Sequence, residues 1–345
     1  MSATDDLRFR GGLPHLLQRM AAIHASGESC ALGMVVATTG STYQKPGAIV
    51  LLDKTGMRHG AISGGCLEPE LEDRARMVLR ENHAGLVEFD TRSDEDLVFG
   101  SGTGCRGRIR LLLLPQAHSA PLFLALTSLS EAAGAMEVTL VIEGDDTGCG
   151  CARLGDETWY WRRDGQPLAR TEFERAMSVA PIAQVSVNSP PAVVLLGTGP
   201  ETAPLHLFMQ QLGWRVLAVE HRGRWLKFAH AAGVEHIVQQ RPDEAAPHWL
   251  REQPDAAIAM THNFALDLEH LRVCAHSNLP YVGLLGPGAR RDALLADLGA
   301  HDAGRLRPRL HGPVGLGLGG SGPDAVALAI VAELQQHFVQ RQRIR

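Results

Sequence analysis

Residues 192–202 read Ala192-Val193-Val194-Leu195-Leu196-Gly197-Thr198-Gly199-Pro200-Glu201-Thr202, and this stretch decides the fold of the second half of the chain. Its first five residues are all apolar, which predicts a strand that is buried on both faces. The two glycines predict a tight turn, and the apolar spacing over 205–212 predicts a helix after it. A second strand, expected over 216–219, ends at Glu220, about twenty residues after the glycines.

A strand, a glycine turn, a helix and a second strand form the Rossmann arrangement, although Thr202 stands at the place of its third glycine. Glycines at this turn let a phosphate approach the helix N-terminus, and the acid that follows can take ribose hydroxyls. Further strands are expected over 235–238, 256–260 and 281–284, with helices between them. We therefore predict an α/β chain whose second half is a doubly wound parallel sheet.

The first half has a different pattern, and at 345 residues the chain exceeds the usual size of one hydrophobic core. Helices are expected over 13–25, 69–80 and 121–134, and strands over 31–38, 48–52, 57–63, 85–89, 109–114, 138–142 and 157–161. The double proline at 190–191 marks the expected boundary. We predict an N-terminal α+β domain over 1–188 and a Rossmann-like domain over 189–345.

Ligands of doubly wound sheets bind beyond the carboxyl ends of the strands, so the residues directly after each strand form one candidate site. The candidates there for binding NAD(P) or another nucleotide are Gly197, Gly199, Glu220, His262, Arg290 and Arg291. If the ligand is NAD(P), the chain is an oxidoreductase and His262 is the proton donor that we would propose. A lone histidine is more often a structural residue, and the sequence leaves both interpretations open.

The composition excludes several classes of protein. Hydrophobic residues make up 45% and charged residues 21% of the chain, as in an ordinary globular protein. The formal net charge of −5 argues against binding to nucleic acid or to an anionic membrane, since both require a basic surface. No uncharged run approaches the roughly 20 residues of a transmembrane helix. Six scattered cysteines, after an N-terminus without a signal-peptide core, predict reduced thiols and a cytoplasmic location.

A second candidate site lies in the first half, where residues 62–70 read Ile-Ser-Gly-Gly-Cys-Leu-Glu-Pro-Glu. Adjacent glycines after Ser63, at Gly64 and Gly65, let successive N–H groups point to one side, and a helix that begins near Pro69 adds its partial positive end. Cys66 lies at the edge of this anion pocket, where a helix N-terminus favours a nucleophilic, metal-binding thiolate. The alternative interpretation is a tight turn with a cysteine that packs as a small apolar residue.

A similar glycine-rich loop with a cysteine occurs over 99–107, where Gly104, Cys105 and Arg106 precede a predicted strand. It is either a second loop of backbone donors beside a thiol or an ordinary glycine-rich hairpin. Because both loops adjoin strands of one domain, we hypothesise that Cys66 and Cys105 share a pocket.

Other motifs give no further candidate. Cys149-Gly150-Cys151 lies in a turn-rich stretch without a second pair of ligands nearby, so we interpret it as structural. The sequence also lacks the motifs of HExxH metalloproteases, P-loop proteins and α/β-hydrolases.

Six blocks of sequence, spread in order over roughly residues 12–335, carry a resemblance to a known family. The blocks are Gly40-Ser41-Thr42-Tyr43 with Lys45-Pro46-Gly47, Ser63-Gly64-Gly65-Cys66-Leu67-Glu68, Gly104-Cys105-Arg106-Gly107, Thr261-His262-Asn263, Tyr281-Val282-Gly283-Leu284-Leu285-Gly286 with Arg290-Arg291, and Gly312-Pro313-Val314-Gly315-Leu316. Together they resemble the XdhC/CoxI family of xanthine dehydrogenase accessory proteins. The chain departs from the family pattern in its Gly-Thr-Gly-Pro-Glu-Thr turn and in Glu220, where an aspartate is common.

The resemblance implies a maturation factor rather than an enzyme with its own turnover. Such a factor binds molybdenum cofactor (molybdopterin), protects it while the metal receives a sulfido ligand, and delivers it to a molybdenum hydroxylase apo-enzyme of the xanthine dehydrogenase type. A cysteine desulfurase is the further partner implied, and a homodimer is expected. Glycine-loop N–H groups would hold the phosphate, Cys66 or Cys105 would contact the molybdenum, and Glu68 would hydrogen-bond the pterin.

Overall fold

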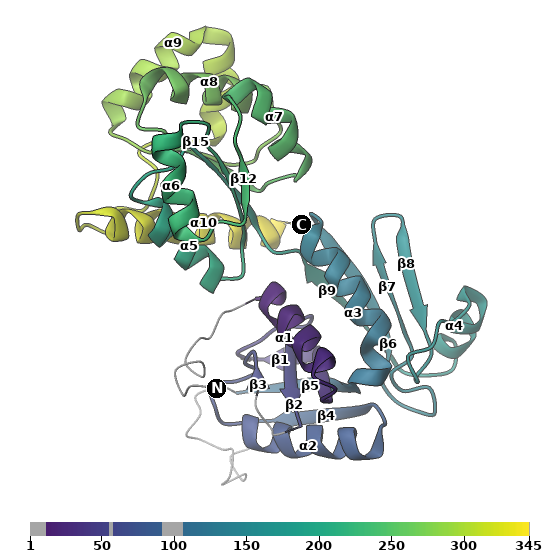
Figure 1. Cartoon of the computed structure of the whole chain (residues 1–345). Coiled ribbons are helices and arrows are strands. Elements are labelled where there is room, and N and C mark those ends of the chain that lie inside the picture. The colour runs from purple at the N-terminus through teal and green to yellow at the C-terminus, as the bar shows by residue number, and fades with distance from the viewer. Residues whose placement is uncertain (1–11, 55–57, 92–105, 345) are drawn as a thin grey trace. The chain divides into compact units, whose positions relative to one another are not determined.

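The computed structural model describes residues 12–54, 58–91 and 106–344, and the chain divides into two compact units, Met1–Ser189 and Pro190–Arg345. Figure 1 shows the elements of both units in chain order. Within the described residues, no helix combines the length and the apolar character that crossing a membrane requires.

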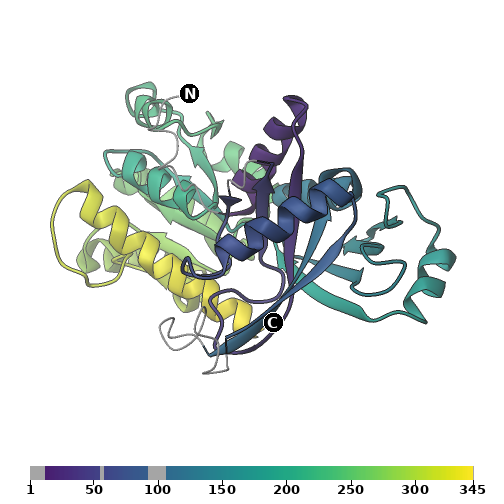
Figure 2. The ribbon, with the colours of Figure 1, turned by 90° about the horizontal axis from the view of Figure 1, so that it is seen from below.

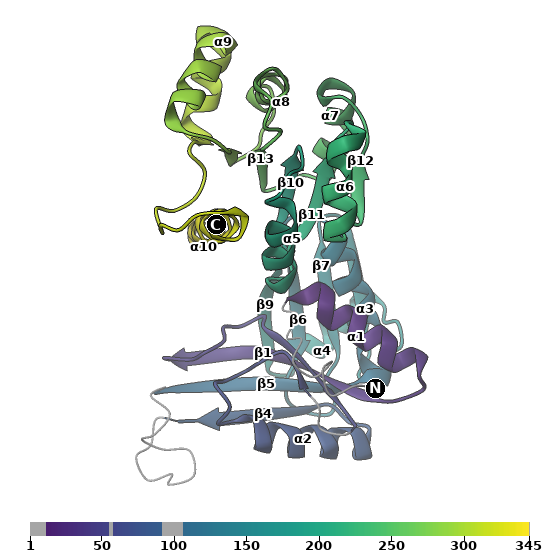
Figure 3. The same ribbon diagram turned by 60° about the vertical axis from the view of Figure 1, so that its left-hand side comes forward.

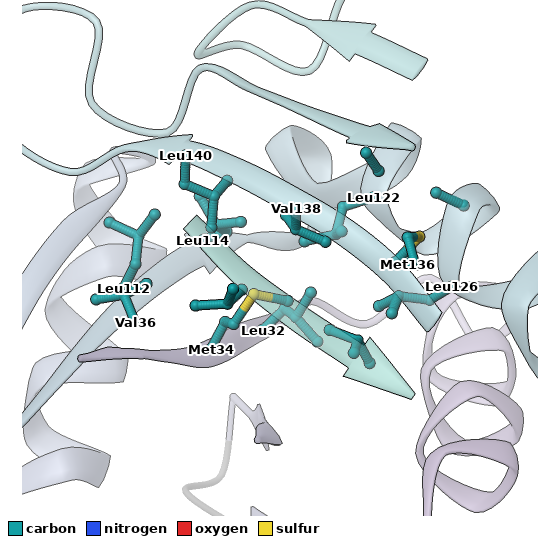
Figure 4. Close-up of a cluster of buried hydrophobic side chains, with 14 of the residues drawn as sticks. Leu32, Met34, Val36, Leu112, Leu114, Leu122, Leu126, Met136, Val138 and Leu140 are labelled. Atoms are coloured by element: carbon teal, nitrogen blue, oxygen red, sulfur yellow. The ribbon is translucent and has the colours of Figure 1, made fainter. Parts of the chain in front are cut away.

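The first unit contains a five-stranded antiparallel sheet in the order β3-β2-β1-β5-β4. Its strands are β1 (Cys30–Gly40), β2 (Ile49–Asp53), β3 (Arg58–His59), β4 (Gly85–Asp90) and β5 (Gly107–Pro115). Side chains alternate along each strand, so both faces of the sheet are apolar and both are covered. Figure 4 shows one face, where Leu32, Met34 and Leu112 meet side chains of a neighbouring helix and strand.

Three helices cover this sheet: α1 (Leu13–Ala25), α2 (Glu68–Glu81) and α3 (Gln116–Glu131). Helices α1 and α3 pack on the face shown in Figure 4. Helix α2 lies along the other face, as Figure 3 shows, and buries Leu71, Ala75 and Val78 against β1, β5 and β4. The predicted helix after Pro69 is therefore present, and it begins directly after the loop that carries Cys66.

A second antiparallel sheet of the first unit has the order β8-β7-β6-β9. Its strands are β6 (Ala135–Val141), β7 (Gly150–Leu154), β8 (Glu157–Trp161) and β9 (Ile182–Asn188), and α4 (Arg170–Met177) lies beside it. The turn-rich interpretation of 149–151 was wrong in part, because β7 begins at Gly150. Gly150 has no side chain, and this leaves room for the ring of Trp161. A Cβ built on Gly150 would lie 2.4 Å from that ring. Cys149 is buried and its thiol donates to Trp161 O at 3.1 Å, so this cysteine has a structural role.

The second unit is a six-stranded sheet in the order β12-β11-β10-β13-β14-β15 with every neighbouring pair parallel. Its strands are β10 (Ala192–Leu196), β11 (Arg215–Val219), β12 (His236–Val238), β13 (Ala256–Ala259), β14 (Val282–Leu284) and β15 (Leu310–His311). In chain order this is the 3-2-1-4-5-6 sheet of the Rossmann fold, so the predicted α/β fold is confirmed.

Helices cover both faces of the parallel sheet, and each unit therefore has its own cores. Helices α5 (Thr202–Gln211), α6 (Gly223–Ala232) and α10 (Pro323–Ile344) pack on one face, and α7 (Pro242–Arg251), α8 (Phe264–Ala275) and α9 (Gly288–Leu306) on the other, followed by a short 3₁₀ helix, Arg307–Arg309. The long helix α10, yellow in Figure 2, packs beside α5.

Candidate functional site

The loop between β3 and α2 carries Cys66 and is open on its glycine side. Gly64 and Gly65 are both exposed, and a Cβ added at either would meet no atom within 4 Å. Gly65 has φ +117°, a conformation that side-chain-bearing residues rarely adopt. The loop therefore needs this glycine for its shape, and it leaves space above its backbone.

Ser63 and Glu68 hold the loop from below. The N–H of Ser63 donates to Glu68 Oε1 at 3.0 Å, and its hydroxyl donates to the other carboxylate oxygen. The same hydroxyl oxygen accepts the N–H groups of Gly65 and Leu67, each at 3.2 Å. Burial opposes the charge of Glu68, but the hydrogen bonds from Ser63 and the nearby Arg58 outweigh it and lower the pKa of this carboxyl.

Glu68 is only 3% exposed and both of its oxygens are bound to Ser63. Its partners in this structure lie within the loop, and the hydrogen bond from Glu68 to a pterin stays a prediction. Its place in the structure is to position the loop. The sequence could not show this, because a carboxylate one residue before Pro69 is equally suited to solvent and to a loop partner.

Cys66 is half-buried. Its Sγ lies 3.5 Å from Ser63 Oγ, and one side of the residue packs against the buried cluster between the sheet and α2. The thiol is thus held by Ser63, and the residue as a whole is only partly buried. Both sequence interpretations of Cys66 contribute, since it packs as an apolar residue and lies at an open loop.

A third loop, 41–47, connects the Cys66 loop to the start of β5. Gln44 Nε2 donates to Ala61 O at 2.8 Å, and Ser41 N donates to Arg106 O at 3.1 Å. The backbone at Gly40 lies close to the backbone just before β5, since a Cβ on Gly40 would lie 2.5 Å from Arg106 O. Arg106 is exposed at this end of the sheet. Gly104 and Cys105 lie outside the described residues, so the shared pocket of Cys66 and Cys105 stays a prediction.

Among the described residues of this loop, Cys66 is the thiol, and no complete set of metal ligands surrounds it. Among residues 12–54, 58–91 and 106–344, no three His, Cys, Asp or Glu side chains gather in a way that could hold a metal ion. Within those residues Cys66 is thus a single soft donor, which suits a metal that an organic cofactor already coordinates.

In the second unit, Glu220 is turned inward. It is 2% exposed and accepts the N–H of Thr198 at 3.2 Å. Arg222 donates to it from the backbone at 2.9 Å and from the guanidinium at 2.7 and 2.9 Å. Burial would raise the pKa of Glu220, but the hydrogen bonds and charge of Arg222 outweigh burial and lower it.

Gly199 and His262 come together as the sequence predicts, but with a partner that it did not single out. His262 Nε2 lies 3.1 Å from Glu201 Oε2, and the His262 ring stacks on Trp225 with centroids 5.8 Å apart. The Glu201 hydrogen bond raises the pKa of His262 and lowers that of Glu201. The Gly199 N–H donates to Thr202 Oγ1 at 2.9 Å. The sequence does place Glu201 in the turn where a phosphate would bind. A carboxylate there repels a phosphate, and this repulsion was the signal from which the role of Glu201 could have been predicted.

The two arginines are occupied by protein partners. Arg290 Nη2 lies 2.6 Å from Asp267 Oδ2, and Asp267 is fully buried. Arg291 donates to Gly312 O at 2.6 Å and pairs with Asp292. Arg290 therefore ties α9 to α8, and Arg291 ties α9 to the segment after β15, so both guanidinium groups have protein partners.

Together, the parallel order of the sheet and the open cysteine loop define a two-part protein, an α+β unit followed by a Rossmann unit. Residues 23–90 match the family model described as "XdhC and CoxI family", and residues 193–334 match the model described as "XdhC Rossmann domain". The chain belongs to the XdhC/CoxI family, which confirms the resemblance seen in the sequence.

Two relatives extend over nearly the whole chain. A protein of Bacillus subtilis (strain 168), described as a probable xanthine dehydrogenase subunit, is 27% identical over 323 residues, which are 90% of this chain and 93% of that protein. A crystal structure of a protein described as a xanthine dehydrogenase from Bacillus halodurans is 24% identical, with a TM-score of 0.75 over 94% of this chain and 96% of that one. The second likeness concerns the fold alone.

Proposed function

We propose that this chain is an accessory factor that binds molybdenum cofactor and delivers it to a molybdenum hydroxylase of the xanthine dehydrogenase type. The observation that carries the proposal is the half-buried Cys66 thiol, held by Ser63 beside the open backbone of Gly64 and Gly65. Family membership supports the partner class, as does the description of the Bacillus subtilis relative as a probable xanthine dehydrogenase subunit.

The chemistry of the loop matches the two ends of the proposed ligand. When bound, the cofactor supplies a soft metal centre and a phosphate ester, and thiolates are the ligands that soft metals prefer. Cys66 would hold the metal, and the open glycine backbone beside the N-terminus of α2 would admit the phosphate. Ser63 and Glu68 keep the loop in this shape before the ligand arrives.

Further parts of the proposal concern what happens to the bound cofactor. We propose that it is protected while its metal receives a sulfido ligand, with a cysteine desulfurase as the sulfur donor, and that the factor acts as a homodimer. The alternative function, an NAD(P)-dependent oxidoreductase, is not proposed, because both glycine N–H groups of the turn in the Rossmann unit are occupied.

Replacing Cys66 by serine is expected to lower cofactor retention about tenfold, equivalent to about 1.4 kcal/mol, since a hydroxyl is a poor ligand for a soft metal. The protein would be purified from a host that makes the cofactor, and retention measured by the fluorescence of the released, oxidised pterin. The melting temperature is expected to change little, because the side chain is half-exposed. Cys151→Ser, at another half-buried cysteine of the same unit, is the matched control and is expected to retain the cofactor.

Equal retention by Cys66→Ser and wild type would remove Cys66 from the site. A wild-type protein that carries no pterin but oxidises NADH would overturn the proposed function as a whole.

A further inference from the structure

The glycine turn after β10 is the place where a Rossmann fold receives a diphosphate, and the hydrogen-bond partners of its glycines can be identified. The N–H of Gly197 donates to Val219 O (2.8 Å), and that of Thr198 donates to Glu220 Oε2 (3.2 Å). The N–H of Gly199 donates to Thr202 Oγ1 (2.9 Å), and that of Thr202 donates to Gly199 O (3.0 Å). Pro200 has no N–H. The backbone donors of both glycines, of Thr198 and of Thr202 therefore already have partners within the chain.

The space above the turn is filled as well. In a dinucleotide-binding turn the second glycine lets the backbone approach the pyrophosphate. Here a Cβ built on Gly199 would lie 2.8 Å from His262 Nε2 and 3.1 Å from Glu201 Oε2. The surface of Gly199 that a pyrophosphate would contact is covered by a carboxylate and an imidazole.

The ribose position is also taken. An acid at the end of the second strand normally receives ribose hydroxyls. Glu220 holds this position, but its oxygens receive Thr198 and Arg222 and it is 2% exposed. Releasing it would leave the Arg222 guanidinium without its carboxylate, which is costly for a buried pair.

From these contacts we infer that the crevice of the Rossmann unit is a self-occupied anion site, in which the Glu201 carboxylate, held by His262, takes the place of a ligand phosphate and excludes dinucleotides. The N-terminus of α5 favours an anion, and the chain supplies its own. A phosphate group binds there only in exchange for Glu201, and His262 is then the residue that receives it. The inference concerns residues of the second unit only and does not depend on the proposed function.

The test uses the full chain and two probes, inorganic pyrophosphate and NADH, titrated by isothermal calorimetry. Trp225 fluorescence reports on the site, because this ring stacks on His262. Wild type is expected to bind neither probe at about 1 mM, and Glu201→Ser is expected to bind pyrophosphate at least about tenfold more tightly than wild type. Serine is a good residue at a helix start, so α5 is retained. Glu244→Ser, an exposed acid in the first turn of α7, is the matched control and is expected to gain nothing.

Binding of NADH or pyrophosphate by wild type as tightly as by Glu201→Ser would overturn the inference. So would a folded Glu201→Ser protein that gains no affinity. If Glu201→Ser does not fold, Glu201→Gln removes the charge while keeping the volume, and it must show a smaller gain for the inference to stand. Neither probe contains a pterin or a metal, so these outcomes are independent of the Cys66 experiment.

Discussion

Replacing Asp267 by alanine is expected to lower the free energy of unfolding of the second unit by about 3–5 kcal/mol. Asp267 is fully buried, and its Oδ1 accepts both the N–H (3.1 Å) and the hydroxyl (2.6 Å) of Thr261. Its Oδ2 pairs with Arg290 at 2.6 Å. The alanine variant would leave the partly buried Arg290 guanidinium and the buried N–H of Thr261 without their carboxylate partner, and breaking such a pair from one side is costly. Urea unfolding followed by circular dichroism measures the loss.

The neighbouring residue pair provides the control for this prediction. Arg291 and Asp292 also form an ion pair, at 2.7 Å, but the Asp292 side chain is 64% exposed. Asp292→Ala is therefore expected to cost less than about 1 kcal/mol, as exposed pairs generally do. Equal losses in the two variants would show that burial of Asp267 is not what makes its pair important.

Acidification from pH 7 to pH 5 is expected to remove about 2 kcal/mol of stability through His270. His270 is 3% exposed, its Nδ1 has no hydrogen-bond partner within the described part of the chain, and burial lowers its pKa from 6.5 to about 4. In the unfolded chain it takes up a proton below pH 6.5, whereas in the folded chain it stays neutral until about pH 4. Protons therefore bind preferentially to the unfolded state in this window, and stability falls as the pH falls.

The measurement compares the pH dependence of urea unfolding for wild type and His270→Gln. The glutamine variant is expected to lose about 2 kcal/mol less than wild type between pH 7 and pH 5, whatever its absolute stability. His301→Gln, which removes an exposed histidine of α9, is expected to keep the wild-type dependence. Identical pH dependence in wild type and His270→Gln would contradict the assignment.

The parallel sheet was predictable from the sequence because its strands are buried on both faces. Ala192–Leu196 and Ala256–Ala259 are buried without exception, so each strand appears as an uninterrupted apolar run. The glycine turn and Glu220 then fixed the type of fold. Helix α5 nevertheless begins at Thr202, three residues earlier than expected, because Thr202, Ala203 and Pro204 contribute no large apolar side chain to the helical pattern.

The second sheet of the first unit was only partly predictable. Strand β9 alternates exposed and buried residues, but its buried side chains are the small Ala183, Val185 and Val187, which give a weak signal. Strand β7 begins at a glycine whose role depends on Trp161, a contact that no local pattern reveals. Helix α4 buries only Phe173, so it lacks an apolar stripe.

For the candidate sites, the sequence indicated which residues lie close together but not which of them hydrogen-bond to other protein groups. Ser63 and Cys66 do lie at one open loop, since adjacent glycines and a helix start are local features. The carboxylates of Glu68 and Glu220 were assigned to ligands, and both are bound by their own neighbours. Those partners were set by the geometry of the turns, because Ser63 and Arg222 lie within five residues of the acids that they satisfy.

The separate cores of the two units bear on how proteins of this family can diverge. Each described apolar cluster draws its residues from only one side of the junction between Ser189 and Pro190. A crossover at this junction between two family genes would exchange an entire half while leaving every packed cluster intact. Natural recombination and laboratory chimaeras could therefore pair a thiol-bearing front half with a different rear half without cutting through a described core.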